Sequence, residues 1–349
     1  MLKIAKERLN TLFARLSGQF DLFLPINKDN QVNFGPWKEE AKVDIETLKT
    51  TSSPKNLFFP QYENLYSTTL TGGQIHIKPE AMADPAKDRP FAVFGVRACD
   101  RMGIELMDDL FLSEPIDRFY EARRSMGIII SLSCPNPLMT CFCKAFGIDA
   151  ANPGGDVDTW LIGDVLYWKA QTEAGLKLTE EVLELLEPVN KSDEDIFLSE
   201  QESICQKIDA LPYSTLPLTN FIPGNLLKIF DAPEWDSLHK ACLACGTCTF
   251  VCPTCFCYDI MDFDAGGCIN RYRCWDSCMY SDFTMMAHGN PRNTQKERFR
   301  NRFMHKLVYH TVNHEGQHSC VGCGRCVSKC PVSLHIIKVI KALGVKEYA

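Results

Sequence analysis

The chain has 349 residues and a formal net charge of −7, a length that predicts two domains and ample chain for a buried core. It contains 18 cysteines, yet no apolar run of about 18 residues that would predict a membrane span. The charged N-terminus MLKIAKERLNTLFARL lacks the apolar core of a secretion signal. We therefore expect a cytoplasmic protein, suited to anaerobic metabolism, whose reduced thiols bind metals rather than form disulfides.

The charge is unevenly distributed along the chain. Residues 236–349 carry 14 basic and 9 acidic residues, whereas residues 1–235 carry 23 and 35. A basic surround favours an anionic metal cluster, and the acidic remainder argues against nucleic-acid binding.

Residues 1–235 predict an α/β domain with a small sheet, the N-terminal half of an α+β protein. Helices are expected at 2–16, 100–111, 116–124, 179–186 and 192–208. Strands are expected at 57–59, 74–77, 91–96 and 127–132, and a hairpin at 159–171. The proline-rich stretch 209–235 is the expected link to a second domain.

Two cysteine quartets mark that second domain, residues 236–349. CLACGTCTFVCP holds the first quartet and CVGCGRCVSKCP the second, both with the spacing C-x-x-C-x-x-C-x-x-x-C-P of bacterial [4Fe–4S] ferredoxins. In two-cluster proteins the fourth cysteine ligates the other cluster. The predicted ligand sets are therefore Cys242, Cys245, Cys248 and Cys330 for cluster 1, and Cys320, Cys323, Cys326 and Cys252 for cluster 2. Paired zinc ribbons would need C-x-x-C pairs rather than quartets.

The long segment between the quartets favours a mostly α-helical ferredoxin-like arrangement. A helix is expected at 295–310, with basic residues along it, and another at 338–343. A β-hairpin ferredoxin would join its two motifs with a far shorter segment.

A further set of four cysteines, the N-terminal group, comprises Cys99, Cys134, Cys141 and Cys143. Two of them directly follow the strands expected at 91–96 and 127–132. Because ligands converge at the carboxyl ends of neighbouring strands, this group predicts a third cluster or a Cys₄ zinc site. Buried free thiols packing as small hydrophobes are the alternative.

A last set, the cysteine trio, follows the first quartet and comprises Cys255, Cys257 and Cys278. Three cysteines are fewer than a full ligand set. The trio is therefore compatible with an additional cluster, with a redox dithiol, or with thiols that only pack beside the clusters. No dinucleotide or P-loop motif follows any expected strand, and no catalytic residue can be singled out.

These motifs together resemble the β subunit of sulfhydrogenases, which are cytosolic hydrogenases, and the dicluster electron-transfer subunit of anaerobic sulfite reductase. The resemblance rests on FGVRACD, SCPNPLMTCFC, CLACGTCTFVCPTCFC, WDSC, RFRNRF and CVGCGRCVSKCP, and spans most of the chain. It favours a functional role for the N-terminal group. Cys205, Cys268 and Cys274 match nothing in the pattern and are expected to be structural.

The resemblance implies an iron–sulfur relay subunit of a cytosolic multi-subunit oxidoreductase. Its partners would be a flavoprotein that binds FAD and NAD(P)H and a second redox module: a hydrogenase small subunit, a sulfite reductase or a bifurcating module. Since the chain has no nucleotide motif of its own, the flavin must come from a partner. The alternative is a cysteine- or cluster-based site on this chain that reduces sulfur compounds or disulfides.

Overall fold

The structure, a computed structural model, describes residues 1–80, 82 and 88–345. Its larger sheet has eight strands in the order β10-β1-β9-β8-β7-β6-β2-β3. They are β1 Leu2–Ala5, β2 Asp21–Lys28, β3 Gln31–Pro36, β6 Phe91–Val96, β7 Gly127–Leu132, β8 Val157–Ile162, β9 Val165–Ala170 and β10 Glu187–Pro188. The central pairs β2–β6, β6–β7 and β7–β8 are parallel, and the outer pairs are antiparallel.

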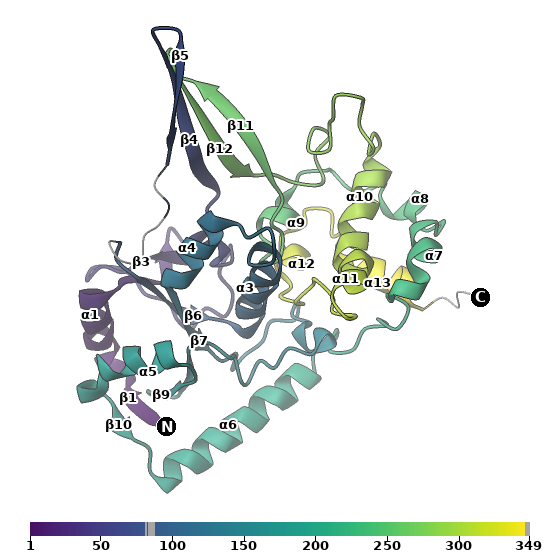
Figure 1. Cartoon of the computed structure of the whole chain (residues 1–349). Coiled ribbons are helices and arrows are strands. Elements are labelled where there is room, and N and C mark those ends of the chain that lie inside the picture. Colours follow the sequence, from purple (N-terminus) through teal and green to yellow (C-terminus); the bar gives the residue numbers. More distant parts are fainter. Residues whose placement is uncertain (81, 83–87, 346–349) are drawn as a thin grey trace.

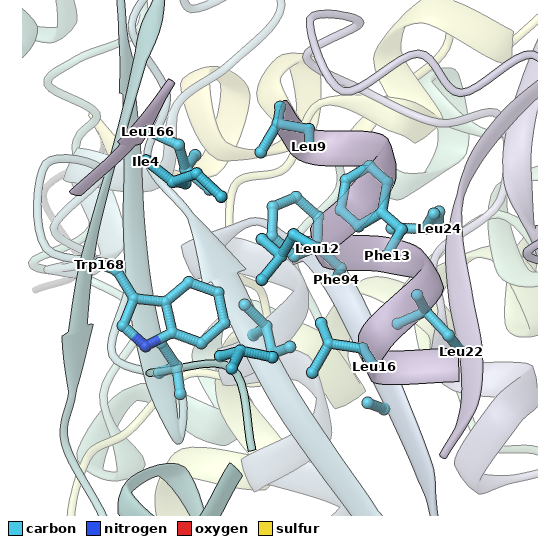
Figure 2. Close-up of a cluster of buried hydrophobic side chains, with 14 of the residues drawn as sticks. Ile4, Leu9, Leu12, Phe13, Leu16, Leu22, Leu24, Phe94, Leu166 and Trp168 are labelled. Carbon is cyan, nitrogen blue, oxygen red and sulfur yellow. The ribbon is translucent and has the colours of Figure 1, made fainter. Parts of the chain in front are cut away.

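One face of this sheet is covered by α1 (Leu9–Gln19). Its apolar side chains follow the helical spacing i, i+3, i+4, i+7, so a single stripe is buried: Leu9, Leu12, Phe13 and Leu16. Figure 2 shows this stripe facing Leu22, Phe94 and Trp168 from the sheet. The packing ties the first residues of the chain to the central strands.

The other helices of this region lie around the sheet. They are α2 Lys55–Phe58, α3 Ala98–Phe111, α4 Arg118–Met126, α5 Glu173–Glu180 and α6 Lys191–Asp209. Helix α3 follows β6 after one residue, and a loop follows β7. Because β6 and β7 are parallel neighbours, these two connections leave the same edge of the sheet.

A second sheet projects from the rest of the molecule (Figure 1). It has four antiparallel strands in the order β11-β12-β4-β5: β4 Tyr62–Thr71, β5 Gln74–Pro79, β11 Tyr258–Asp264 and β12 Cys268–Trp275. Tyr62 pairs with Cys274, so strands from distant parts of the sequence share this sheet. Every residue of β5 is exposed.

The C-terminal region is built mainly from helices. They are α7 Leu226–Phe230, α8 Trp235–Leu238, α9 Thr247–Phe250, α10 Gln295–Met304, the π-helix η5 His305–Tyr309, α11 His310–Asn313, α12 Arg325–Lys329 and α13 Ile336–Gly344. Short 3₁₀ turns lie between the longer elements, most of them in the N-terminal region: η1 Lys6–Arg8, η2 Cys143–Phe146, η3 Leu183–Leu185 and η4 Pro223–Asn225. Phe299, Phe303 and Leu307 from α10 and η5 pack against Ile337 and Ile340 of α13.

The α+β fold class is confirmed, with helices and sheets mixed throughout. The strands expected at 91–96 and 127–132, the hairpin at 159–171 and the helix at 192–208 are present. The sheet of this region was expected to be small, but it has eight strands. Three further expectations were wrong. Residues 2–5 form a strand, residues 57–58 end a helix, and helix α5 ends at Glu180, where one was expected to begin. In the described part of the chain, no helix combines the length and apolar character needed to cross a membrane.

Candidate metal centre

The two quartets adopt matching local structures. In each, a glycine with a positive φ angle precedes a short helix that carries the third cysteine: Gly246 (φ 71°) before α9 and Gly324 (φ 75°) before α12. A Cβ at Gly246 would lie 2.5 Å from the Tyr280 hydroxyl, and one at Gly324 would lie 2.1 Å from the Thr140 carbonyl oxygen. Only glycine fits both the backbone conformation and the close approach.

Cys252, the fourth cysteine of the first quartet, lies close to thiols of both quartets. The Cys252 thiol interacts electrostatically with the first three cysteines of the second quartet. Cys248 interacts with the other members of the first quartet. The Cys330 sulfur accepts a hydrogen bond from the Leu334 amide at 3.2 Å, which orients it within its own loop. Among the described residues, the recorded contacts of the Cys330 sulfur are with Leu334, and none is with the first quartet.

Burial and crowding make several of these thiols hard to ionise without a cation, whereas hydrogen bonds lower the pKa of Cys245 and of Cys252. Burial is the largest cause that raises the pKa of Cys326, to about 12, and neighbouring cysteines raise it further. Burial likewise raises the pKa of Cys320 and of Cys248. Thiolates are the form that binds metal, and bound metal supplies the positive charge that such a set lacks.

Two buried cations lie beside the quartets. The side chains of Arg302 and Lys306 are each 4% exposed, and among the described residues neither has a carboxylate partner. Arg302 donates to the Cys248 carbonyl oxygen at 3.3 Å, and Lys306 donates to the carbonyl oxygen and hydroxyl of Thr254. Because an unpaired buried charge is costly, an anionic group must balance them. An iron–sulfur cluster held by thiolates is such a group, so these residues fit it.

The basic residues expected along the helix at 295–310 do not all face solvent. Arg302 and Lys306 point into the protein, whereas Lys296 is partly exposed and pairs with Asp236 on the surface. A helix begins at Gln295 as expected, with Thr294 and Glu297 forming a capping box.

The N-terminal group comes together at one edge of the large sheet. Cys99 lies in the first turn of α3 after β6, and Cys134 follows β7. Cys141 lies on the next loop, and Cys143 begins the 3₁₀ turn η2. All four line one narrow cavity of about 20 Å³ with Cys323. Burial raises the pKa of Cys134 to about 11 and that of Cys143 to about 12.

This group lies directly against the second quartet. The Phe142 amide donates to the Gly322 carbonyl oxygen at 2.9 Å, and a Cβ at Gly322 would lie 2.4 Å from the Phe142 carbonyl oxygen. Arg325, inside the second quartet, forms a buried ion pair with Asp100, next to Cys99. Two thiol sets from distant sequence thus share a tightly packed boundary.

The cysteine trio is divided by the structure. The Cys255 thiol is hydrogen-bonded to that of Cys252, whereas the Cys257 thiol is hydrogen-bonded to that of Cys278. That bond lowers the pKa of Cys257, to about 7, and raises that of Cys278. A third buried cation, Lys55, donates to the Cys255 carbonyl oxygen at 2.6 Å.

The remaining cysteines lie elsewhere. Cys268 and Cys274 belong to β12 in the projecting sheet, and Cys205 is exposed on α6. All 18 cysteines are free thiols. No group of three or more His, Cys, Asp or Glu side chains within the described residues is close enough to hold a single metal ion. A cubane separates its four thiolate ligands more widely than one ion does.

Sequence reasoning did not find the buried cations or the Asp100–Arg325 pair. One signal was available for Lys306, because apolar residues flank it and His305 on both sides in FMHKLV. For Lys55 and Asp100 the chain offers no local signal, because their partners are about 200 residues away.

Comparison with known proteins defines the class first. Residues 241–334, which contain both quartets, match the family described as a 4Fe–4S dicluster domain. The protein is therefore an iron–sulfur protein of the electron-transfer class.

A relative then extends the similarity to the whole chain. Sulfhydrogenase 2 subunit beta of Pyrococcus furiosus is 28% identical over 345 residues, covering 97% of this chain and 96% of the relative. The chain is thus a homologue of that subunit, and the resemblance expected from the motifs is confirmed. No solved structure matches the chain.

Proposed function

We propose that this chain is the electron-relay subunit of a cytoplasmic multi-subunit oxidoreductase. It would pass single electrons between a flavoprotein that binds FAD and NAD(P)H and a second redox module of the hydrogenase, sulfite reductase or bifurcating type. The homologue is itself named as the beta subunit of a sulfhydrogenase, which supports a role within a complex. We assign no catalytic residue to the relay.

The observation that carries the proposal is the packing of the N-terminal group against the second quartet. The Phe142–Gly322 hydrogen bond joins the two loops, and Cys99 and Cys323 interact electrostatically. Bound [4Fe–4S] clusters would supply one-electron transfer at each thiol set. Three neighbouring sets would then form a continuous route from the N-terminal domain (1–235) to the cluster domain (236–349).

The proposed ligands keep the ferredoxin assignment. Cluster 1 would use the first three cysteines of the first quartet with Cys330, and cluster 2 the first three of the second quartet with Cys252. The N-terminal group would hold the third cluster. For Cys255 we propose a place beside cluster 2, because its thiol contacts that of Cys252.

The test is reduction by a partner. Chain purified without oxygen is mixed with an NAD(P)H-oxidising flavoprotein that co-purifies with it, and cluster bleaching is followed by stopped-flow absorbance. We expect NAD(P)H to bleach the clusters only when the flavoprotein is present. Bleaching that is slower than turnover of the native complex would contradict a relay role.

A second candidate function is a sulfur-compound or disulfide reductase site on this chain. It is favoured by one observation, the contact between the Cys257 and Cys278 thiols at the wall of a cavity of about 680 Å³. The two functions are compatible, because one chain can both relay electrons and hold a substrate site.

A further inference from the structure

The Cys257 and Cys278 thiols are brought together by the base of the projecting sheet. Tyr258 pairs with Trp275 at the start of the β11–β12 hairpin, and the Asp276 amide donates to the Cys257 carbonyl oxygen at 2.9 Å. This pairing brings two cysteines that are about 20 residues apart in sequence to the wall of one cavity, where their thiols interact. A backbone clamp of this kind holds the thiols together whether or not a metal is bound nearby.

The pair faces an open cavity of about 680 Å³, a volume within the usual range for small-molecule sites. Both sulfur-bearing residues line it, together with the aromatic residues Phe111, Phe256 and Tyr258. Cys257 is partly exposed, whereas Cys278 is buried. Cys257 is thus the more accessible of the two residues.

Polar side chains also line the cavity. They include Arg292, Asn301, His305 and Tyr309, of which the last two belong to the π-helix η5. Two carboxylates, Glu114 and Asp117, line it as well, and Asp117 is paired with Arg273. π-Helical turns are frequent at functional sites. Among the described residues no carboxylate pairs with Arg292, so its guanidinium is available to bind an anionic group on a ligand.

We propose that Cys257 and Cys278 form a thiol–disulfide exchange site, whose substrate is a small organic disulfide that carries a carboxylate. This inference rests on the second candidate function and specifies its residues and substrate class. Arg292 positions the carboxylate, and the aromatic wall contacts the carbon chain.

The exchange takes two steps that balance. Cys257 attacks one sulfur of the disulfide, its S–S bond breaks, and the leaving thiolate takes up a proton while a mixed disulfide forms on Cys257. Cys278 then attacks the Cys257 sulfur and releases the second thiol. The substrate gains two electrons and two protons, and the protein is left with a Cys257–Cys278 disulfide. A dithiol reductant such as dithiothreitol resets the pair in the assay.

The test uses the full chain with its clusters, purified without oxygen and freed of reductant. Dithiodiglycolate is added as the probe, released thiols are counted, and peptides are mapped by mass spectrometry. We expect two thiols per chain and a Cys257–Cys278 disulfide. C278S should stop at a mixed disulfide on Cys257 with one thiol released, and C257S should release none. The matched control, C274S in the projecting sheet, should behave as the unmodified chain.

The carboxylate preference is tested by substitution of the proposed anion-binding residue. Arg292→Gln should slow exchange with dithiodiglycolate by about tenfold and leave exchange with the neutral 2-hydroxyethyl disulfide unchanged. An equal effect on both probes would overturn the role of Arg292.

Two results would overturn the exchange site itself. One is a pair that stays reduced while other cysteines are modified. The other is the loss of about four irons per chain in C257S and C278S, which would make them cluster ligands. Neither result bears on the relay, which is tested by reduction through the flavoprotein.

Discussion

At the scale of single residues, the buried cations explain most about the site. Arg302, Lys306 and Lys55 are each almost fully buried and donate only to backbone or hydroxyl oxygens in the contacts that the structure records. The negative groups that interact with them are cysteine thiolates, Cys252 among them for all three cations. Their charge would therefore favour the reduced form of a bound cluster, which carries one more negative charge.

Removing one of these cations should lower a cluster potential. We expect Lys306→Met to lower the midpoint potential of the nearest cluster by roughly 60 mV, about a tenfold change in a one-electron equilibrium. The potential is measured by redox titration followed by electron paramagnetic resonance. Lys296→Met, which removes an exposed charge on the same helix, should leave it within a few millivolts. Equal shifts in both variants would refute the assignment.

The buried pair Asp100–Arg325 makes a separate prediction about stability. Asp100→Asn leaves Arg325 buried without its carboxylate, so the free energy of unfolding should fall by about 3 kcal/mol. Asp262→Asn breaks the exposed pair with Arg271, which solvent screens, and should cost far less. Urea denaturation of both variants without oxygen checks the difference, and similar losses would contradict it.

At the scale of elements, the sequence predicted best where local pattern and burial agree. Strands β6 and β7 were predicted to the residue because both are short, almost wholly buried apolar runs. Helix α6 begins within one residue of its expected start, and its capping box is formed by Asn190 and Asp193. Strands β4, β11 and β12 were missed, because polar residues interrupt them and β4 pairs with a strand about 200 residues away.

The elements also decide which contacts of the candidate site could be predicted from the sequence. Cys99 and Cys134 could be predicted to meet because parallel strands end at one edge. The separation of Cys255 from the Cys257–Cys278 pair could not be predicted. It depends on the β11–β12 hairpin, which the sequence analysis did not predict. Likewise, nothing in the local pattern of CVGCGRC indicates that Gly322 packs on Phe142.

The Gly322 contact makes a prediction about how closely the N-terminal group and the second quartet pack. Gly322→Ala adds a Cβ 2.4 Å from the Phe142 carbonyl oxygen at a φ of 58°, so the two loops must separate. We expect weaker magnetic coupling between neighbouring reduced clusters in electron paramagnetic resonance spectra. Gly224→Ala, with nothing within 4 Å of the added Cβ, is the matched control. Unchanged coupling in Gly322→Ala would argue against adjacent clusters.

At the scale of the whole molecule, a C-terminal dicluster region is joined to an α/β region that adds its own thiols. The two regions share the projecting sheet, the Asp100–Arg325 pair and the loop contact at Gly322. A dicluster domain alone would need none of these. The homologue matches along nearly its full length, so the same joint architecture is expected there.

Loss of the N-terminal group should remove one cluster and spare the others. We expect Cys134→Ser to lower the iron content by about four per chain while the quartets keep theirs. Cys205→Ser, on the exposed face of α6, should change nothing. Loss of all iron in Cys134→Ser would point to general unfolding, which circular dichroism of the same sample detects.

The most direct measurement is the iron and acid-labile sulfide content of the unmodified chain, purified and kept without oxygen. Two quartets and the N-terminal group filled with cubanes predict about twelve irons and twelve sulfides per chain. About eight of each would remove the third cluster from the route. Stoichiometric zinc without sulfide would contradict the account as a whole.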